Sequence, residues 1–186
     1  MGSDEFFLYA SSFFKVVVSL GALYGLSIPA YLKVILVSLS DTIDCGLPKL
    51  LGLYKNARFC EEDQYQRVDK ITDALVYALL VLYVYQQSLL SRTGREVVLG
   101  LLIYRLLGVG LYLIENNRKQ LFYFPNFFLE ILFVLLFTRN IGFRVILICL
   151  VVVFKVVQEY FLHYVERKGS SVEAILLRLG EVLAST

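Results

Sequence analysis

Four aspartates are spaced so that their carboxylates could act together. Asp41 and Asp44 are three residues apart in the chain, and Asp69 and Asp73 are four apart. On a helix, both spacings place the two side chains of a pair on one face, about one turn from each other. Two such faces can meet where the helices that carry them are neighbours.

The surroundings of these pairs are apolar, and carboxylates close together there repel one another and tend to protonate unless a cation compensates them. A carboxylate set favours a hard divalent cation, Mg²⁺ or Mn²⁺ and also Ca²⁺. Such an ion beside basic side chains is suited to binding phosphate or pyrophosphate. The alternative is that the aspartates cap helices or lie in water. We expect Asp69 and Asp73 to open their helix, where the helix dipole alone favours negative charge.

The two pairs carry a resemblance to a known family. The chain reads D-T-I-D-C-G-L-P-K over residues 41–49 and Y-Q-R-V-D-K-I-T-D over residues 65–73. It resembles the CDP-alcohol phosphatidyltransferases at these residues, whose pattern is D-x-x-D-G-x-x-A-R, a spacer, and then G-x-x-x-D-x-x-x-D. All four aspartates match, and they fall on the second and third expected helices, as in that family.

Four other positions depart from the family's pattern, and the spacer is longer than usual. Cys45 and Tyr65 stand where the pattern has glycine, Pro48 stands where it has alanine, and Lys49 replaces its arginine. Glycine at such positions lets a nucleotide approach the backbone. Cys45 and Tyr65 would therefore narrow the nucleotide pocket.

The resemblance implies a metal-dependent transfer of a substituted phosphate from a CDP-linked donor to an alcohol acceptor, in phospholipid synthesis. Asp41, Asp44, Asp69 and Asp73 would bind the divalent metal that grips the donor's diphosphate. Asp73 would also be catalytic, as general base on the acceptor hydroxyl. The candidates for binding the acceptor or the lipid phosphate are basic side chains: Lys49, Arg105, Arg118 and Lys119.

Arg105 is also open to a structural role. It lies in the middle of an apolar stretch, where a lipid-facing position is unfavourable. The alternative to phosphate binding is an ion pair with an acid within the membrane, such as Glu130. Asn126 and Glu130 are one turn apart on the fifth expected helix, and we expect them to face a partner helix or a cavity.

The elements that position these residues follow from composition. Hydrophobic residues make up 58% of the 186 residues, charged residues make up 18%, and the mean hydropathy is +0.69. The apolar residues form blocks close to the roughly 20 residues that a helix needs to cross a membrane. We therefore expect an all-α polytopic membrane protein, a bundle of about six transmembrane helices. The expected helices cover about residues 6–26, 30–54, 68–90, 95–114, 121–138 and 144–163.

A C-terminal segment, residues 171–184, is amphipathic and could lie on the membrane surface or pack on the bundle or a partner. We expect residues 1–186 to form a single integral membrane domain, because no linker divides them. Basic residues near helix ends tend to stay in the cytoplasm. They favour a cytoplasmic location for both termini and for the acidic site, in a membrane that the sequence does not specify. On that side lie Lys49, Lys55, Arg58, Arg67, Arg118, Lys119, Arg167, Lys168 and Arg178, against Arg92, Arg95, Arg139 and Arg144 on the other.

Two other functions compete with the phosphotransferase. One is a non-catalytic membrane scaffold or interaction protein with the same helical frame. The other is a small transporter that uses Arg105, Asn126 and Glu130 as polar groups at the midplane. The acidic residues gather at one surface. This arrangement favours a catalytic site, or the remnant of one, over a transport pore. The expected partners are membrane lipid and a CDP-linked donor, with a homodimer left open and no nucleic acid.

Overall fold

The computed structural model describes residues 3–43, 63–117 and 119–160, and within these ranges all regular structure is helical. The expected all-α class is therefore confirmed for the described part of the chain. The elements are α1 (Ser3–Leu20), a π-helical turn η1 (Gly21–Gly25), α2 (Ala30–Ile43), α4 (Asp63–Gln86), α5 (Arg92–Glu115), α6 (Lys119–Tyr123), α7 (Phe128–Phe137) and α8 (Ile141–Tyr160).

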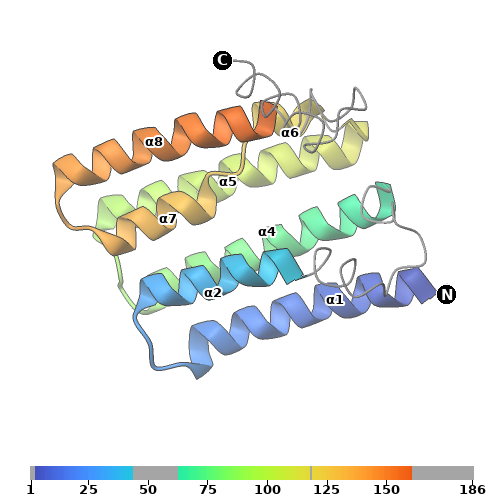
Figure 1. Cartoon of the computed structure of the whole chain (residues 1–186), viewed down its shortest axis with the longest axis horizontal. Helices are drawn as coiled ribbons and strands as arrows, with labels where there is room; N and C mark the ends of the chain where they lie inside the picture. The colour runs from blue at the N-terminus through green and yellow to red at the C-terminus, as the bar shows by residue number, and fades with distance from the viewer. Residues whose placement is uncertain (1–2, 44–62, 118, 161–186) are drawn as a thin grey trace, which may run out of the picture.

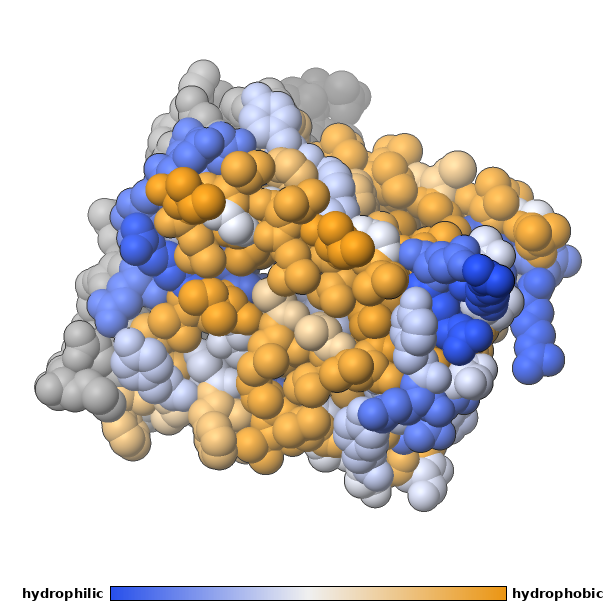
Figure 2. All heavy atoms as spheres, turned by 180° about the vertical axis from the view of Figure 1, so that it is seen from behind, coloured by the Kyte–Doolittle hydropathy of each residue, from blue (hydrophilic) through white to orange (hydrophobic). Residues whose placement is uncertain are grey.

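The protein is built to lie in a membrane. Figure 2 shows hydrophobic side chains spread across the middle of one face, with hydrophilic side chains gathered toward the two ends of the helices. Helices of this length satisfy their own backbone hydrogen bonds, as lipid requires. In the described ranges, four stretches are long and apolar enough to cross a membrane: Leu8–Gly25, Arg92–Glu115, Gln120–Phe137 and Ile141–Gln158.

The long helices lie side by side with alternating directions (Figure 1). α1 packs against α2 and α4, α4 against α5, and α7 against α2, α5 and α8. The starts of α1 and α4 and the ends of α2, α5 and α8 lie at the same end of the bundle (Figure 1). We call this the acidic end, because α4 carries Asp69 and Asp73 in the half nearer to it.

Short polar residues set the turns between helices. The Ser91 hydroxyl accepts a hydrogen bond from the Gly94 N–H at 3.3 Å and caps the start of α5. Asn116 ends α5 in the left-handed conformation, with φ of 50°. At the start of α8, Oδ1 of Asn140 accepts from the N–H of Phe143 at 3.0 Å. Asparagine is common at both kinds of position because its side chain can replace a backbone partner. The gaps expected after residues 114 and 138 are confirmed, although α8 begins at Ile141 rather than near residue 144.

The start of α4 differs from the expected one. The helix begins at Asp63 rather than near residue 68. Asp69 and Asp73 therefore do not open their helix but lie more than one turn inside it, where the stabilisation of negative charge by the helix dipole has faded. The explanation of these two carboxylates by the dipole alone is wrong, and other groups must compensate their charge.

The expected helix over residues 121–138 is interrupted. Pro125 has no N–H to donate and disfavours the helical conformation of the residue before it, so the stretch divides into α6 and α7. The close approach of this break to α5 depends on Gly108, because a Cβ built on Gly108 would overlap the side chain of Phe124. The break leaves polar backbone and side-chain groups inside the bundle.

The buried core joins α2, α4, α5 and α7. The ring of Tyr77 stacks on that of Phe128 with 4.8 Å between centroids, and both side chains are fully buried. Buried Lys33 donates to the carbonyl of Leu23 at 2.6 Å and lies over the ring of Tyr83. None of the residues in the membrane-crossing stretch of α8 is buried. The interior is therefore formed by the helices that precede α8.

Candidate functional site

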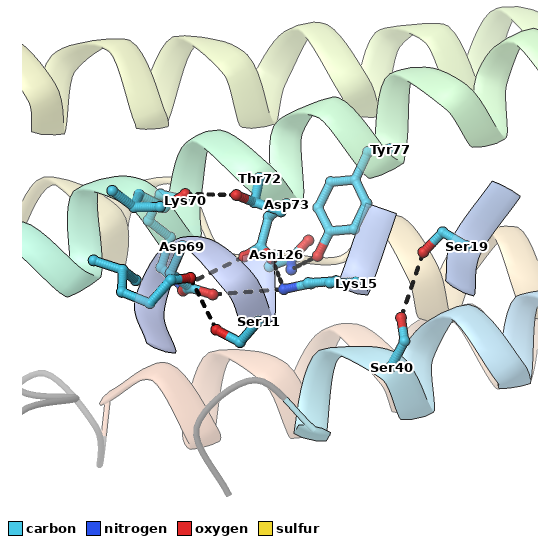
Figure 3. A network of polar contacts seen from close by, with 12 residues as sticks. Ser11, Lys15, Ser19, Ser40, Asp69, Lys70, Thr72, Asp73, Tyr77 and Asn126 are labelled. Carbon is cyan, nitrogen blue, oxygen red and sulfur yellow. Dashed lines mark hydrogen bonds and ion pairs between the residues drawn. The ribbon is translucent and has the colours of Figure 1, made fainter. Parts of the chain in front are cut away.

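Four charged side chains meet between α1 and α4 (Figure 3). The ammonium group of Lys15 contacts Oδ1 of Asp73 and lies 3.5 Å from Oδ1 of Asp69. Nζ of Lys70 lies 2.5 Å from Oδ2 of Asp69 and 3.4 Å from Oδ2 of Asp73. Each lysine therefore bridges both carboxylates. We call Lys15, Asp69, Lys70 and Asp73 the charge cluster.

The cluster is largely withdrawn from the surface. The side chain of Lys15 is 3% exposed and that of Asp73 is 4% exposed, whereas Lys70 is 20% exposed. A buried charge is costly unless it is paired and hydrogen-bonded. Two ammonium groups against two carboxylates meet this condition, because their formal charges cancel.

Helical spacing on two elements builds the cluster. Asp69 and Asp73 are four residues apart on α4 and therefore share the face that contacts α1. On α1, Ser11 and Ser19 each lie one turn from Lys15, so the three residues form a polar stripe in an otherwise apolar helix. The Ser19 hydroxyl lies 3.4 Å from the hydroxyl of Ser40 on α2. This stripe therefore touches α4, which carries Asp69 and Asp73, and α2, which carries Asp41.

Two of the four predicted metal ligands can be placed fully, and a third in part. Asp69 and Asp73 come together in the charge cluster. The backbone of Asp41 belongs to the end of α2, directly after Ser40, and its side chain lies outside what the structure describes. Asp44 lies outside the described residues altogether.

Among the predicted phosphate-binding residues, Arg105 alone has a described side chain. Lys49 and Arg118 lie outside the described residues, and of Lys119 only the backbone is described, in α6. The amphipathic segment expected over residues 171–184 also lies outside them. The roles expected for Lys49, Arg118 and Lys119, and the amphipathic helix expected over residues 171–184, stay predictions.

Arg105 is buried and only partly satisfied. Its Nη1 donates to the carbonyl of Phe124 at 3.0 Å, at the break between α6 and α7. Its Nε has no hydrogen-bond partner in the described part of the chain. Arg105 is thus held at this break with one buried donor unused.

The ion pair between Arg105 and Glu130 that the sequence suggested does not form. Glu130 instead pairs with Lys155 of α8, with 2.7 Å between Oε1 and Nζ. The reason is the direction of each side chain. Glu130 faces α8, whereas Arg105 of α5 faces the break before α7 and finds the Phe124 carbonyl there.

Asn126 and Glu130 do not act as one polar set either. Asn126 precedes α7, and its amide donates to the hydroxyl of Tyr77 on α4 at 2.5 Å. Tyr77 lies one turn beyond Asp73 on the same helix. Figure 3 shows Tyr77 and Asn126 beside the charge cluster. The polar interior therefore extends one turn from the cluster toward the middle of the bundle.

The cluster suits a hard cation by the type and direction of its oxygen atoms. Oδ1 of both aspartates turns toward one positive group, the ammonium of Lys15, and Oδ2 of both turns toward Lys70. Carboxylate oxygens are the ligands that Mg²⁺ and Mn²⁺ prefer. Within the ranges that the structure describes, no group of three or more His, Cys, Asp or Glu residues lies close enough to hold a metal. A fuller ligand set would need Asp41 and Asp44.

Sequence reasoning missed Lys15 and Lys70 as partners of the aspartates. The signal for Lys15 is visible in retrospect, because it is the one charged residue between Phe6 and Leu26 and has a serine one turn away on each side. A lysine in such a position needs a partner inside the bundle. Lys70 stands between the two aspartates in the motif.

Comparison of the chain with family models, with curated proteins and with solved structures finds no match. The charge cluster and the residues around it therefore provide the evidence for function.

Proposed function

We propose that the protein is a membrane phosphotransferase, which uses a divalent cation at the acidic end to transfer a substituted phosphate from a CDP-linked donor to an alcohol. One observation carries the proposal. Asp73 and Ser40 contact the same face of α1 one turn apart, through Lys15 and Ser19. Asp41 directly follows Ser40 in α2, so the backbone of Asp41 and the pair of Asp69 and Asp73 belong to helices that contact neighbouring turns of α1.

The proposed topology has six membrane crossings: α1, α2, α4, α5, the α6–α7 stretch, and α8. Both termini and the acidic end would face the cytoplasm, and residues 171–184 would lie along the membrane surface. The arrangement of the described helix ends supports this topology, since the start of α1 and the end of α8 lie at one end of the bundle (Figure 1). The donor would enter from the cytoplasm and the lipid from the bilayer.

In the proposed site, Asp41, Asp44, Asp69 and Asp73 hold Mg²⁺ or Mn²⁺. When bound, the ion would offset the charge on the departing cytidine monophosphate (CMP). Asp73 accepts the proton of the acceptor hydroxyl, whose oxygen forms a bond to phosphorus as the bond from that phosphorus to the CMP oxygen breaks. The unused Nε of buried Arg105 supports a role in binding the acceptor or the lipid phosphate.

The test is an assay for CMP release by the purified protein. The donors would be CDP-diacylglycerol and CDP-choline, with Mg²⁺ or Mn²⁺ and a panel of alcohols. We expect CMP release with at least one donor and alcohol, and an increase in thermal midpoint when metal is added. Absence of CMP with every donor, together with a thermal midpoint that metal leaves unchanged, would contradict the proposal.

Asp73→Asn tests the assigned base. We expect it to abolish CMP release while the protein still purifies as a folded species. Asp63→Asn is the matched control, because Asp63 is exposed at the first turn of the same helix and lies outside the charge cluster. Retained turnover in Asp73→Asn would remove Asp73 from the base role.

A second candidate function is favoured by the lysines of the charge cluster. Lys15 and Lys70 already neutralise Asp69 and Asp73, as ion pairs in a non-catalytic membrane scaffold would. A scaffold needs neither metal nor donor. The same assay separates the two functions, since a scaffold releases no CMP and gains no stability from Mn²⁺.

A further inference from the structure

We infer that Lys15 is a positioning residue, whose ammonium group holds Asp69 and Asp73 together and must leave them when a divalent cation binds. This inference rests on the proposed function. Lys15 reaches the aspartates from α1, 54 and 58 residues away in the chain. Folding of the bundle therefore sets this contact, and local sequence does not.

The ammonium group of Lys15 occupies oxygen atoms that a divalent cation would use. Nζ of Lys15 contacts Oδ1 of Asp73 and lies 3.5 Å from Oδ1 of Asp69. A cation held by both carboxylates through these oxygens would need the same lone pairs. It would also repel an ammonium group at contact distance, strongly so where little water screens the charges. The two cations therefore exclude each other, and Lys15 competes with the metal.

Lys15 also holds the two carboxylates in position. Lys70 also contacts both carboxylates, but only through Oδ2. Without Lys15, the Oδ1 side of the pair would lose its positive group, and the repulsion between Asp69 and Asp73 would increase. Lys15 limits this repulsion before the metal arrives. Its flexible four-carbon stem then allows the ammonium group to move aside. Lys15 thus keeps Asp69 and Asp73 close enough together to bind a metal ion. Because it competes for the same oxygens, it also lowers the affinity for that ion.

Lys33 provides a matched control. It is a second buried lysine, 7% exposed, but it lies on α2 and donates to the Leu23 carbonyl. It faces the ring of Tyr83 rather than a carboxylate. Lys33→Met removes a buried ammonium group as Lys15→Met does, without changing the charge cluster.

The experiment measures binding of Mn²⁺ to the full-length protein in detergent by electron paramagnetic resonance of free Mn²⁺. We expect Lys15→Met to bind Mn²⁺ roughly tenfold or more tightly than wild type, a coupling of ordinary size between two charged ligands. Lys33→Met should match wild type. Lys15→Gln, which is neutral but still donates hydrogen bonds, should tighten binding in the same direction and keeps the test available if Lys15→Met does not fold.

Thermal unfolding gives an independent readout. Without metal, Lys15→Met should unfold at a lower temperature than wild type, because two buried carboxylates lose one of the two lysines that compensate their charge. Mn²⁺ should raise its midpoint more than it raises that of wild type. A merely structural lysine, such as Lys33, would lower the midpoint without enlarging the response to Mn²⁺.

The outcomes separate this inference from the proposed function. If wild type binds Mn²⁺ and both Lys15 variants bind it equally or more weakly, the inference is overturned and the phosphotransferase proposal stands. If neither wild type nor the Lys15 variants bind Mn²⁺ and no CMP is released, the proposed function fails, and the inference fails with it.

Discussion

Lys155 of α8 and Glu130 of α7 form an ion pair with 2.7 Å between Nζ and Oε1. Both residues lie within stretches that are long and apolar enough to cross a membrane. An isolated charge is costly there, so each residue depends on the other. The pair forms a polar link between α8 and the rest of the bundle.

We expect Glu130→Gln and Lys155→Met each to lower the free energy of unfolding, and the double variant to lose less than the sum of the two losses. The reason is that each single variant leaves one charge without its partner. A coupling of about 0.5–3 kcal/mol is typical of residues in contact. Unfolding by denaturant in detergent micelles measures it.

The control for this cycle is the pair of Arg92 and Glu96 on α5, with 3.0 Å between Nε and Oε1. Their side chains are 90% and 59% exposed, so water screens the interaction. We expect a coupling no greater than about 1 kcal/mol. Additive losses at Glu130 and Lys155 would show that their contact contributes nothing.

The hydrogen bond between Asn126 and Tyr77 fixes the break before α7 to α4. We expect Tyr77→Phe to destabilise the protein by about 1–3 kcal/mol, because the partly buried amide of Asn126 loses its acceptor. Tyr24→Phe is the matched control, since the Tyr24 hydroxyl donates to Gln86 at 2.9 Å in an exposed position where water can replace it. Equal losses of stability in the two variants would mean that the Asn126–Tyr77 hydrogen bond contributes no more than the exposed one.

Two glycines of α5 allow a test of the contact between this helix and the break. A Cβ on Gly108 would overlap Phe124, whereas a Cβ on Gly100 has nothing within 4 Å. Gly108→Ala should lower stability by about 1–3 kcal/mol through overpacking. Gly100→Ala should raise it by up to about 1 kcal/mol, because alanine is the better helix former. Thermal unfolding in detergent distinguishes the two, and a stabilising Gly108→Ala would contradict the close approach.

Local signals in the sequence were sufficient for the helices and several of their ends. Ser91, Asn116 and Asn140 act on backbone groups a few residues away, so the effect of each can be read without knowledge of the bundle. The interruption at Pro125 could also have been read locally. It was missed because the apolar run continues on both sides of the proline.

The pairing of charged residues could not be read in this way. Whether Glu130 meets Arg105 or Lys155 depends on which helices are neighbours and which faces they turn to one another. The same holds for Lys15, whose partners lie on α4. Spacing predicted that Asp69 and Asp73 share a face, but it did not identify the group opposite them.

The absence of buried residues in the membrane-crossing stretch of α8 has a consequence for how the protein is made. All buried hydrophobic side chains in the described ranges lie between Leu8 and Leu135. In the part of the chain that the structure describes, the ribosome has therefore synthesised every buried hydrophobic side chain before it begins α8, which adds only partly buried side chains such as Ile148 and Val151 to the core. We therefore expect the exposed positions of α8 to accept exchange among apolar residues, provided that Lys155 still pairs with Glu130.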